Sequence, residues 1–370
     1  MQKINIALLS PAKNAYSETF IQAHKQFLKG SIFYYFGGEL PTELEGGLLI
    51  NSRKMRIIDI FKGHYRLNKF SLEEQALITS FKLNKIDLVF AEYGGTGEKI
   101  LPICKKLNLP LIVHFHGFDA ARKDQLEKNH NYKEIFNYAS YIVAVSKKME
   151  KELLAMGCPQ EKLVLNVYGP RQEFLEVVPG FSENQFIAVG RFVDKKAPYY
   201  LIMSFLEVVK KFPKAKLIIA GEGELFNTCG NLISFYKLEQ NIELVGVITA
   251  EKFRGFLRES LAFVQHSIIT IDGDSEGSPV VILEASAAGL PVISTNHAGI
   301  PELVIHEQTG LLSEEHEIHE MANNMLRLLE DKNFAIKLGE EGKKHILKNF
   351  TLKRHIATLN DLIEKSIYPN

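Results

Sequence analysis

Two carboxylates flank the start of an apolar segment within Gly273–Leu312. Glu276 precedes the segment, and Glu284 lies inside it among residues that are apolar nearly all round, which predicts a buried helix. A lone buried charge is costly unless it is paired. Ser278 predicts an N-cap and Pro279 the first helical position, and the unpaired amides of such a helix start favour a phosphate. The pattern therefore indicates a ligand with both hydroxyls and phosphates, as in a nucleotide sugar.

The surrounding sequence resembles a known enzyme family. Glu276 and Glu284 match the E-x7-E motif of retaining glycosyltransferases with the GT-B fold, and EGSPVVILEASAAGLPVIST with GIPELV resembles glycosyltransferase family 4. The resemblance implies that Glu284 hydrogen-bonds the ribose hydroxyls and that Glu276 contacts the donor sugar. The alternatives are a buried structural ion pair and a solvated loop carboxylate. The resemblance also implies that four backbone positions hold the distal phosphate: Gly277, Ser278, Pro279 and Val280.

Two basic residues follow the predicted strand Phe186–Gly190. Arg191 and Lys196 match the family pattern of an Arg after a Val-Gly strand end and a Lys five residues later, with Ala197 where the family usually has Gly. The resemblance implies that both cations are catalytic and stabilise negative charge on the departing nucleoside diphosphate. A solvated basic loop is the alternative.

In the first half, His116 lies in the sequence HFHGFD after the predicted strand Pro110–Phe115. The family often has a histidine-containing turn here, near the reacting carbon of the donor sugar. The resemblance therefore implies that His116 and Asp119 position donor hydroxyls or polarise the site, and a structural histidine is the alternative. His114 is predicted to belong to the core.

The loop after the first predicted strand has no paired glycines, which many family members have near donor and acceptor. It carries Ser17, Glu18 and Thr19 in a Ser-Glu-Thr-Phe variant that resembles a bacterial exopolysaccharide or capsule-type subgroup. The resemblance implies acceptor-side contacts for these three residues and for Asp119, and a plain N-cap at Ser17 is the alternative. The resemblance also implies that backbone groups at the turn containing Val247 read the nucleotide base, so UDP- and GDP-linked donors both stay open.

Other motifs are absent or have a different interpretation. Asp272 and Asp274 form an Asp-x-Asp pattern that binds metal in the other large glycosyltransferase architecture, but beside E-x7-E it is interpreted as a polar loop. We therefore expect no metal cofactor. The sequence contains no Walker loop, no G-x-G-x-x-G after the first strand, no G-x-S-x-G elbow and no zinc spacing.

Composition indicates a globular protein of 370 residues with ordinary hydrophobic content and no net charge. Residues 1–175 contain 24 Lys and Arg against 18 Asp and Glu, and the rest contains 20 against 26. The basic half favours an anionic partner such as a membrane surface or a lipid diphosphate, and ordinary surface charge is the alternative. No nucleic-acid partner is expected.

The expected location is the cytoplasm, with peripheral contact at the inner membrane surface as one interpretation of the basic half. No apolar run approaches the roughly 20 residues of a membrane span. The N-terminus enters a strand at once and does not resemble a signal peptide. The cysteines are scattered and are predicted to be reduced thiols: Cys104, Cys158 and Cys229.

Short apolar runs alternate with helix-like stretches, which predicts parallel sheets with crossover helices. The predicted strands are Ile4–Ser10, Ile32–Phe36, Asp87–Ala91, Pro110–Phe115, Tyr141–Val145, Leu163–Val167, Phe186–Gly190, Lys216–Ala220, Ile242–Gly246, Leu261–His266 and Pro291–Thr295. We therefore expect an α/β protein of the GT-B class, with two Rossmann-like, doubly wound domains facing across a cleft. Residues 1–176 form the acceptor-side domain and 177–350 the nucleotide-sugar domain, with a linker at Val177–Gln185. The resemblance implies that the helical segment 351–370 crosses back onto the first domain.

The sequence as a whole predicts a metal-independent retaining glycosyltransferase. It would move a hexosyl unit from a nucleotide sugar to a glycan or lipid-linked glycan, in cell-surface polysaccharide biosynthesis. No obvious nucleophile is poised for a covalent intermediate, which favours a front-face route. Two alternatives stay open: an epimerase or hydrolase of nucleotide sugars on the same fold, and a non-catalytic protein that binds the nucleotide sugar.

Overall fold

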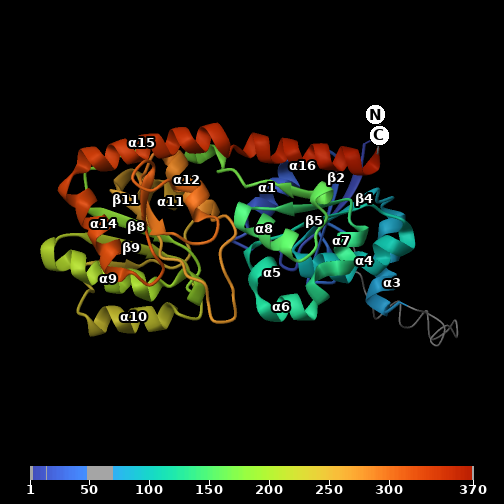
Figure 1. The fold of residues 1–370 in the computed structure, drawn as a ribbon, viewed down its shortest axis with the longest axis horizontal. Helices are drawn as coiled ribbons and strands as arrows, with labels where there is room; N and C mark the ends of the chain where they lie inside the picture. The colour runs from blue at the N-terminus through green and yellow to red at the C-terminus, as the bar shows by residue number, and fades with distance from the viewer. Residues whose placement is uncertain (1–2, 14, 48–69, 369–370) are drawn as a thin grey trace. The chain divides into compact units, whose positions relative to one another are not determined.

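The computed structural model describes residues 3–13, 15–47 and 70–368 (Figure 1). The chain divides into two compact units. The first comprises Met1–Val145, Met149–Asn166 and Ile356–Asn370, and the second comprises Ser146–Lys148 and Val167–His355. The segment Val177–Gln185, predicted as a linker, belongs to the second unit.

The first unit is built on a seven-stranded sheet with the order β3-β2-β1-β4-β5-β6-β7. All pairings are parallel except β2 with β3. Continuous apolar runs form the central strands because both faces of the sheet are covered by helices. The strands are β1 (Asn5–Leu9), β2 (Ser31–Phe36), β3 (Glu43–Leu44), β4 (Leu88–Glu92), β5 (Leu111–His114), β6 (Tyr141–Ala144) and β7 (Leu163–Leu165).

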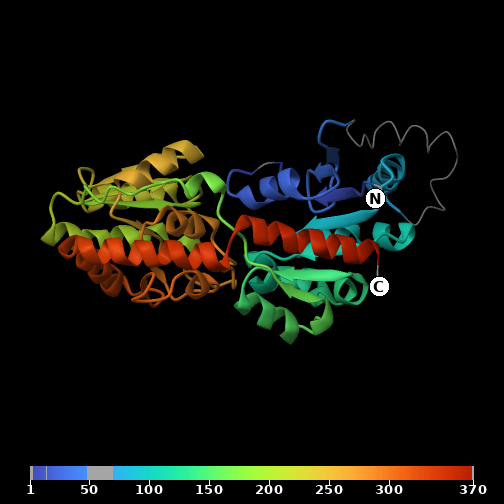
Figure 2. The same ribbon diagram turned by 90° about the horizontal axis from the view of Figure 1, so that it is seen from above.

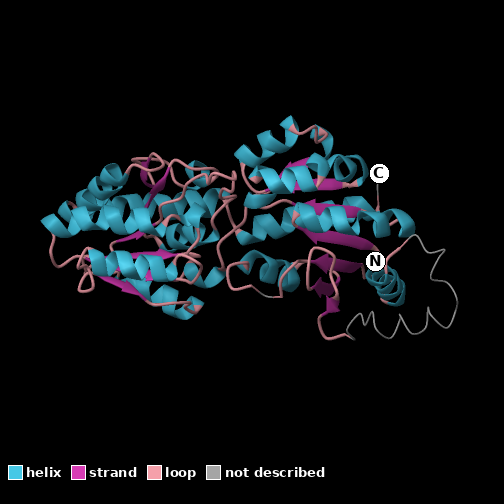
Figure 3. Cartoon of the chain, turned by 90° about the horizontal axis from the view of Figure 1, so that it is seen from below, coloured by secondary structure: helices cyan, strands magenta, loops and turns pink. Residues whose placement is uncertain are grey.

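Helices cover both faces of this sheet (Figure 3). They are α1 (Thr19–Phe27), α3 (Leu72–Leu83), α4 (Gly94–Leu107), α5 (Gly117–Ala121), α6 (Lys123–Lys128), α7 (Lys133–Tyr138), α8 (Lys147–Ala155) and α16 (Leu352–Ile367), with 3-10 turns at His130–Tyr132 and Gln160–Lys162. The last helix, drawn in red in Figures 1 and 2, contributes Leu359, Leu362 and Ile363 to the same core as Ile6, Leu8 and Phe90.

The second unit has a six-stranded, fully parallel sheet with the order β10-β9-β8-β11-β12-β13. Its strands are β8 (Gln185–Val189), β9 (Lys216–Ala220), β10 (Ile242–Leu244), β11 (Ala262–Val264), β12 (Val292–Thr295) and β13 (Gly310–Ser313). Its helices are α9 (Pro198–Lys211), α10 (Phe226–Phe235), α11 (Ala250–Glu259), α12 (Val280–Ala288), α13 (Ile300–Leu303), α14 (Ile318–Glu330) and α15 (Lys332–Asn349), with 3-10 turns at Gln172–Phe174 and Asp194–Lys196.

Each predicted strand corresponds to an observed strand, with ends that differ by at most two residues. The prediction missed β3 and β13 because the first is only two residues long and the second lies in a mostly polar stretch. The predicted helical segment Thr351–Ile367 corresponds to α16, whereas residues 369–370 of the expected segment 351–370 lie outside the described residues. Among the described helices, none is both long and apolar enough to cross a membrane.

Candidate functional site

In both sheets the chain order reverses at one point, between β1 and β4 in the first and between β8 and β11 in the second. Ligands of open parallel sheets bind beyond the C-terminal strand ends at such a point. Arg191 follows β8, and Glu276 lies in the irregular segment between β11 and α12. In the first unit, Glu92 ends β4 and His116 follows β5. Each unit therefore carries candidate residues at its own switch point.

In the second unit, Lys196 and Glu276 form an ion pair with Lys196 Nζ 3.2 Å from Glu276 Oε1. Both side chains are largely buried, at 14% and 9% exposure. Burial acts to raise the pKa of Glu276, but Lys196, Lys195 and His297 outweigh it and bring the pKa to about 2. Glu276 is therefore a carboxylate at neutral pH, so the solvated-loop interpretation does not fit its surroundings.

The start of α12 differs from the prediction by one position. The helix begins at Val280, its N-cap is Pro279 in extended conformation, and no side-chain cap is made. Ser278 is therefore not the N-cap, because Pro279 continues the extended backbone past it. Ser278 Oγ is buried and has no hydrogen-bond partner among the described residues. The helix start thus retains a hydroxyl and unpaired amides that can hydrogen-bond an anion.

Glu284 is 1% exposed in the middle of α12 and accepts a hydrogen bond from Arg171 Nε at 2.6 Å. Burial raises the pKa of Glu284, although Arg171 opposes the rise. Arg171 stacks on the ring of Phe174 at 4.7 Å and also lies 3.7 Å from Glu173 Oε1. Glu284 therefore has a buried ion pair, which was the structural alternative stated for this residue.

Arg191 is exposed, and it lines a small pocket at the end of β8 with Lys196, Gln265 and His266. Gln265 Oε1 is buried there without a partner among the described residues. Ala197, where the family usually has Gly, has φ 35° and ψ 52° as the N-cap of α9. This left-handed conformation explains the family's preference for Gly.

Turns follow β9 and β10, and the second of them contains Val247, the turn predicted to face the nucleotide base. Gly221 has φ 134°, and a Cβ there would lie 1.9 Å from the Gly190 carbonyl oxygen, so close backbone packing requires glycine. Val247 is 43% exposed. Asp274 pairs with Lys195 at 2.9 Å and Asp272 accepts from Thr270, so within the described residues this polar loop has its own hydrogen bonds.

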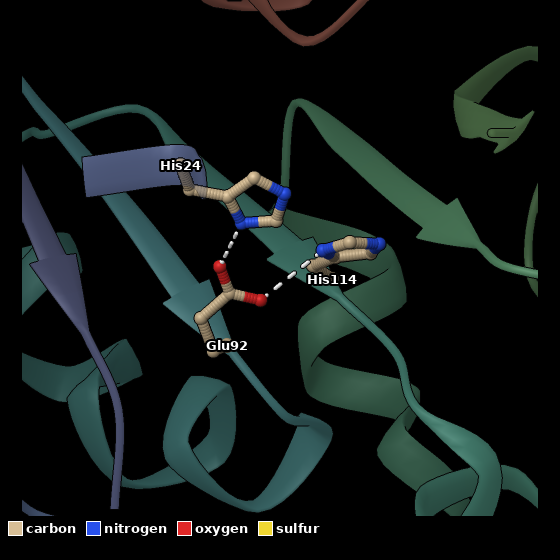
Figure 4. Close-up of side chains that lie close together, drawn as sticks. All are labelled: His24, Glu92 and His114. Carbon is tan, nitrogen blue, oxygen red and sulfur yellow. Dashed lines mark hydrogen bonds and ion pairs between the residues drawn. The ribbon is translucent and has the colours of Figure 1, made fainter. Parts of the chain in front are cut away.

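In the first unit, the carboxylate of Glu92 contacts three imidazoles, and Figure 4 shows two of them, His24 and His114. Glu92 Oε1 lies 2.5 Å from His24 Nδ1, and Glu92 Oε2 lies 3.1 Å from His114 Nδ1 and 3.0 Å from His116 Nε2. We call these four residues the Glu92 cluster. Burial acts to raise the pKa of Glu92, but the imidazoles hold it well below its usual range, and burial lowers the pKa of His114 to about 3. His114 is therefore buried as predicted, but as part of a polar cluster.

His24, Glu92 and His114 offer ligand atoms that all lie within 4.8 Å of one another, a set that a metal ion could in principle bridge. However, the two oxygens of Glu92 face different imidazoles at hydrogen-bond distances, and His116 is not a member of that set. The geometry therefore favours a hydrogen-bonded cluster in which the carboxylate is the shared acceptor.

His116 stacks against Phe20 and Tyr93, with ring centroids 4.6 and 4.3 Å away. Its backbone N–H donates to Asp119 Oδ2 at 2.9 Å. Asp119 is fully buried, and burial raises its pKa to about 6. The structure thus joins His116, Asp119 and Glu92 in one polar network at the ends of β4 and β5.

The acceptor-side prediction falls on the start of α1. Its N-cap is Glu18 rather than Ser17, because Thr19 is the first helical residue, and no side-chain cap is made. Ser17 is exposed, and Glu18 Oε1 accepts a hydrogen bond from Tyr93 Oη at 2.7 Å, which joins Glu18 to the surroundings of His116. Asn14 of the same loop lies outside the described residues.

Several polar residues at these sites were not predicted: His24, Glu92, Arg171, Lys195, His297 and Glu315. Most are isolated in the sequence and meet their partners only through the fold. Glu92 carried one usable signal, because a charged residue directly after the apolar run Leu88–Ala91 predicts a polar group at the end of a buried strand.

Comparison with known proteins decides the family. Residues 173–345 match the family described as "Glycosyl transferases group 1", and residues 33–165 match "Glycosyltransferase Family 4". The chain belongs to these glycosyltransferases. As a family 4 enzyme it has the predicted GT-B fold, with two parallel-sheet α/β units.

Relatives of this glycosyltransferase include the amylovoran biosynthesis glycosyltransferase AmsK of Erwinia amylovora, 29% identical over 286 residues, or 76% of this chain and 70% of that protein. This chain is also 25% identical over 313 residues to the UDP-Gal:alpha-D-GlcNAc-diphosphoundecaprenol alpha-1,3-galactosyltransferase of Escherichia coli, and the match covers 78% of this chain and 78% of that protein. Among solved structures, Anabaena HepE in complex with UDP and glucose has a TM-score of 0.76 and 15% identity over 99% of this chain and 100% of that one. At this low identity, the similarity to HepE shows a shared fold.

Proposed function

We propose that this glycosyltransferase moves a hexosyl unit from a UDP- or GDP-linked sugar to a hydroxyl of a glycan or lipid-linked glycan, in the biosynthesis of a cell-surface polysaccharide. Two relatives carry names that support this proposal, one for amylovoran biosynthesis and one for transfer from UDP-Gal to a diphosphoundecaprenol-linked sugar. A structural neighbour was solved with UDP and glucose. The expected donor is therefore a nucleotide sugar and the expected acceptor is carbohydrate.

The observation that carries the proposal is the start of α12. Ser278 Oγ is buried without a partner among the described residues, at a helix N-terminus, and the Lys196–Glu276 pair belongs to the same site. A phosphate there would accept hydrogen bonds from the Ser278 hydroxyl and from the backbone N–H groups of Gly277, Ser278 and Val280. Glu276 would then contact the sugar, and Glu284 would exchange part of its pairing with Arg171 for the ribose hydroxyls.

The proposed mechanism depends on stabilising the negative charge of the leaving phosphate. When the bond between the anomeric carbon and the diphosphate breaks, negative charge grows on the leaving phosphate, and Arg191, Lys196 and the α12 N-terminus would stabilise it. The acceptor oxygen would attack from the same face and pass its proton to that phosphate, which retains the configuration. His116 and Asp119 would position donor hydroxyls. Trapping a covalent glycosyl-enzyme would contradict this front-face route.

Calorimetric titration with UDP, GDP and ADP, without added metal, tests the donor site. We expect one diphosphate to bind, Arg191→Ala to weaken binding at least tenfold, roughly the effect of one charge-assisted contact, and the exposed Arg258→Ala to bind like the wild type. Failure of a folded protein to bind any diphosphate would contradict the donor site. Binding that appears only with Mg²⁺ or Mn²⁺ would contradict the metal-independent mechanism.

Product analysis separates the alternatives. Incubation with the donor that binds should give transfer only when a glycan acceptor is added. Free sugar or an altered nucleotide sugar in the absence of acceptor would indicate a hydrolase or an epimerase, and binding without turnover would indicate a binding protein. If the acceptor is lipid-linked, flotation with anionic vesicles should recover the protein, as the net charge of residues 1–175 suggests.

A further inference from the structure

The imidazole of His297, a residue outside the E-x7-E motif, links three loops of the second unit. His297 follows β12, and its Nε2 accepts a hydrogen bond from the backbone N–H of Glu276 at 3.0 Å. Its Nδ1 lies 2.6 Å from Oε1 of Glu315, which follows β13. The other oxygen of Glu315 accepts from the backbone N–H of Ile269 at 2.8 Å. Both ends of the irregular segment between β11 and α12 are therefore attached to one side-chain pair.

The hydrogen bonds fix the tautomer of His297. Nε2 accepts from an N–H group, so it carries a lone pair and the ring proton is on Nδ1, where it is donated to Glu315. The His297 side chain is fully buried, and burial lowers its pKa, which favours the same neutral ring. An imidazolium in this position would direct a second donor at the Glu276 N–H.

The backbone at this point has no room to adjust. A Cβ at Gly299 would lie 2.2 Å from the Gly277 carbonyl oxygen, so the loop after β12 packs directly against the residue that follows Glu276. Residues 265–279 contain neither helix nor strand, so these side chains hold the loop in place of a regular element. Lys195 also holds the segment, through Asp274 at 2.9 Å and the Ser275 carbonyl at 3.3 Å, and Thr295 bonds the backbone of Ser267. His297 is the side chain that bonds the backbone N–H of Glu276 itself.

We propose that His297 and Glu315 are positioning residues for the transfer reaction. His297 holds the Glu276 backbone, and with it the Gly277–Pro279 segment, in the orientation that donor binding requires, and Glu315 fixes the ring of His297. This inference rests on the proposed role of the α12 start in binding a nucleotide sugar. Because a shift of about 1 Å in a positioning group can reduce turnover by roughly 100-fold, a change confined to this ring should be visible in kinetics.

Kinetics of four variants test the proposal. His297→Phe removes both ring nitrogens and should lower kcat/KM for the nucleotide sugar by roughly 30- to 100-fold. His297→Gln retains one acceptor and one donor and should recover activity to within about fivefold of the wild type. Glu315→Leu keeps the bond to Glu276 but not the orienting carboxylate, and should lose roughly 5- to 20-fold. If His297→Phe does not fold, Glu315→Leu decides the question.

His306→Phe is the matched control. His306 Nδ1 also accepts a backbone N–H, from Leu312 at 2.9 Å, but this bond does not involve the segment that carries Glu276. The control should lower the melting temperature without lowering kcat/KM. Equal kinetic losses in His297→Phe and His306→Phe, or wild-type kinetics in both His297→Phe and Glu315→Leu, would overturn the proposal.

Long-range ¹H–¹⁵N correlation of the histidines provides a readout that needs no substrate. The signal lost in His297→Gln should be a neutral ring protonated on Nδ1 at pH 7. An imidazolium or an Nε2-protonated ring would overturn the proposal. A wild-type protein that binds no diphosphate would contradict the proposed function instead, so the two failures are distinguishable.

Discussion

The Glu92 cluster and the residues around the start of α12 both bury carboxylates, but they neutralise them differently. In the first, imidazoles share the two oxygens of Glu92. In the second, which we call the α12 site (Arg171, Arg191, Lys196, Glu276, Ser278 and Glu284), the partners of the carboxylates are permanent cations, with Lys196 on Glu276 and Arg171 on Glu284.

The difference concerns what each region can still bind. Imidazoles are short and rigid, and in the Glu92 cluster their hydrogen bonds to one carboxylate hold its geometry. The α12 site combines long cationic side chains with the unpaired Ser278 hydroxyl and the exposed Arg191. An incoming anion therefore meets donors and positive charge at the α12 site, whereas the Glu92 cluster supports the structure around His116. Substitutions in these two regions and beside them test the distinction.

The largest effect is expected for Glu92→Leu. It leaves buried imidazoles without their shared acceptor, and we expect the free energy of unfolding to fall by about 3–5 kcal/mol. Glu92→Gln should cost much less, because its amide oxygen can still accept from His114 and His116. Urea denaturation measures both. Equal losses in the two variants would show that the charge, rather than the acceptor, is what matters.

Lys196→Ala tests the α12 site. It removes the cation that faces the leaving phosphate and should lower kcat by roughly 100- to 1000-fold. The exposed Lys211→Ala, at the end of α9, should behave like the wild type. Steady-state kinetics with the identified donor make the measurement. A loss seen only in KM would assign Lys196 to ground-state binding and weaken the contrast.

Asp119→Asn should change the pH dependence of stability. Burial raises the pKa of Asp119 from 3.8 to about 6, so the folded state holds its proton more tightly than the unfolded state. This contribution to stability is complete below about pH 4 and is lost as the pH rises through about 6. Relative to the wild type, Asp119→Asn should therefore gain about 3 kcal/mol between pH 4 and pH 8. The exposed Asp124→Asn should show no such gain.

Ala197→Gly should have the smallest effect. Ala197 has a left-handed backbone that costs a residue with a Cβ about 1 kcal/mol, so glycine should raise the free energy of unfolding by up to that amount. Glycine also gives the unfolded chain more freedom, which reduces the gain. A melting curve at constant pH measures it. A lower melting temperature would show that the methyl group, fully buried here, contributes more through packing than its conformation costs.

The α12 site was largely visible in the sequence because its chemistry is local. Glu276, Ser278 and Glu284 lie within nine residues of one another, on a segment whose apolar character predicts a buried helix. The error of one position at the helix start arose because Pro279 is compatible with both a first helical residue and an extended cap. The pairing of Lys196 with Glu276 requires only that the ends of β8 and β11, which these residues follow, are adjacent in the sheet.

The Glu92 cluster could not be predicted in the same way. His24 lies on α1, Glu92 at the end of β4, and His114 and His116 at the end of β5. The sheet order β1-β4-β5 brings these elements together. The sequence does not reveal this order, so it gives no reason to connect the four residues. The contact of His297 with Glu315 could not be predicted for the same reason, because their proximity follows from the pairing of β12 with β13.

The return of α16 to the first unit has a consequence for folding during synthesis. The second unit is nearly continuous in the sequence, because residues 167–355 make up all of it except Ser146–Lys148. This unit can therefore fold as soon as it has left the ribosome. The core of the first unit also needs Leu359, Leu362 and Ile363, which are translated after residues 167–355. The N-terminal unit is therefore completed after the unit that follows it, and in the meantime the surface that α16 will cover stays open to chaperones and proteases.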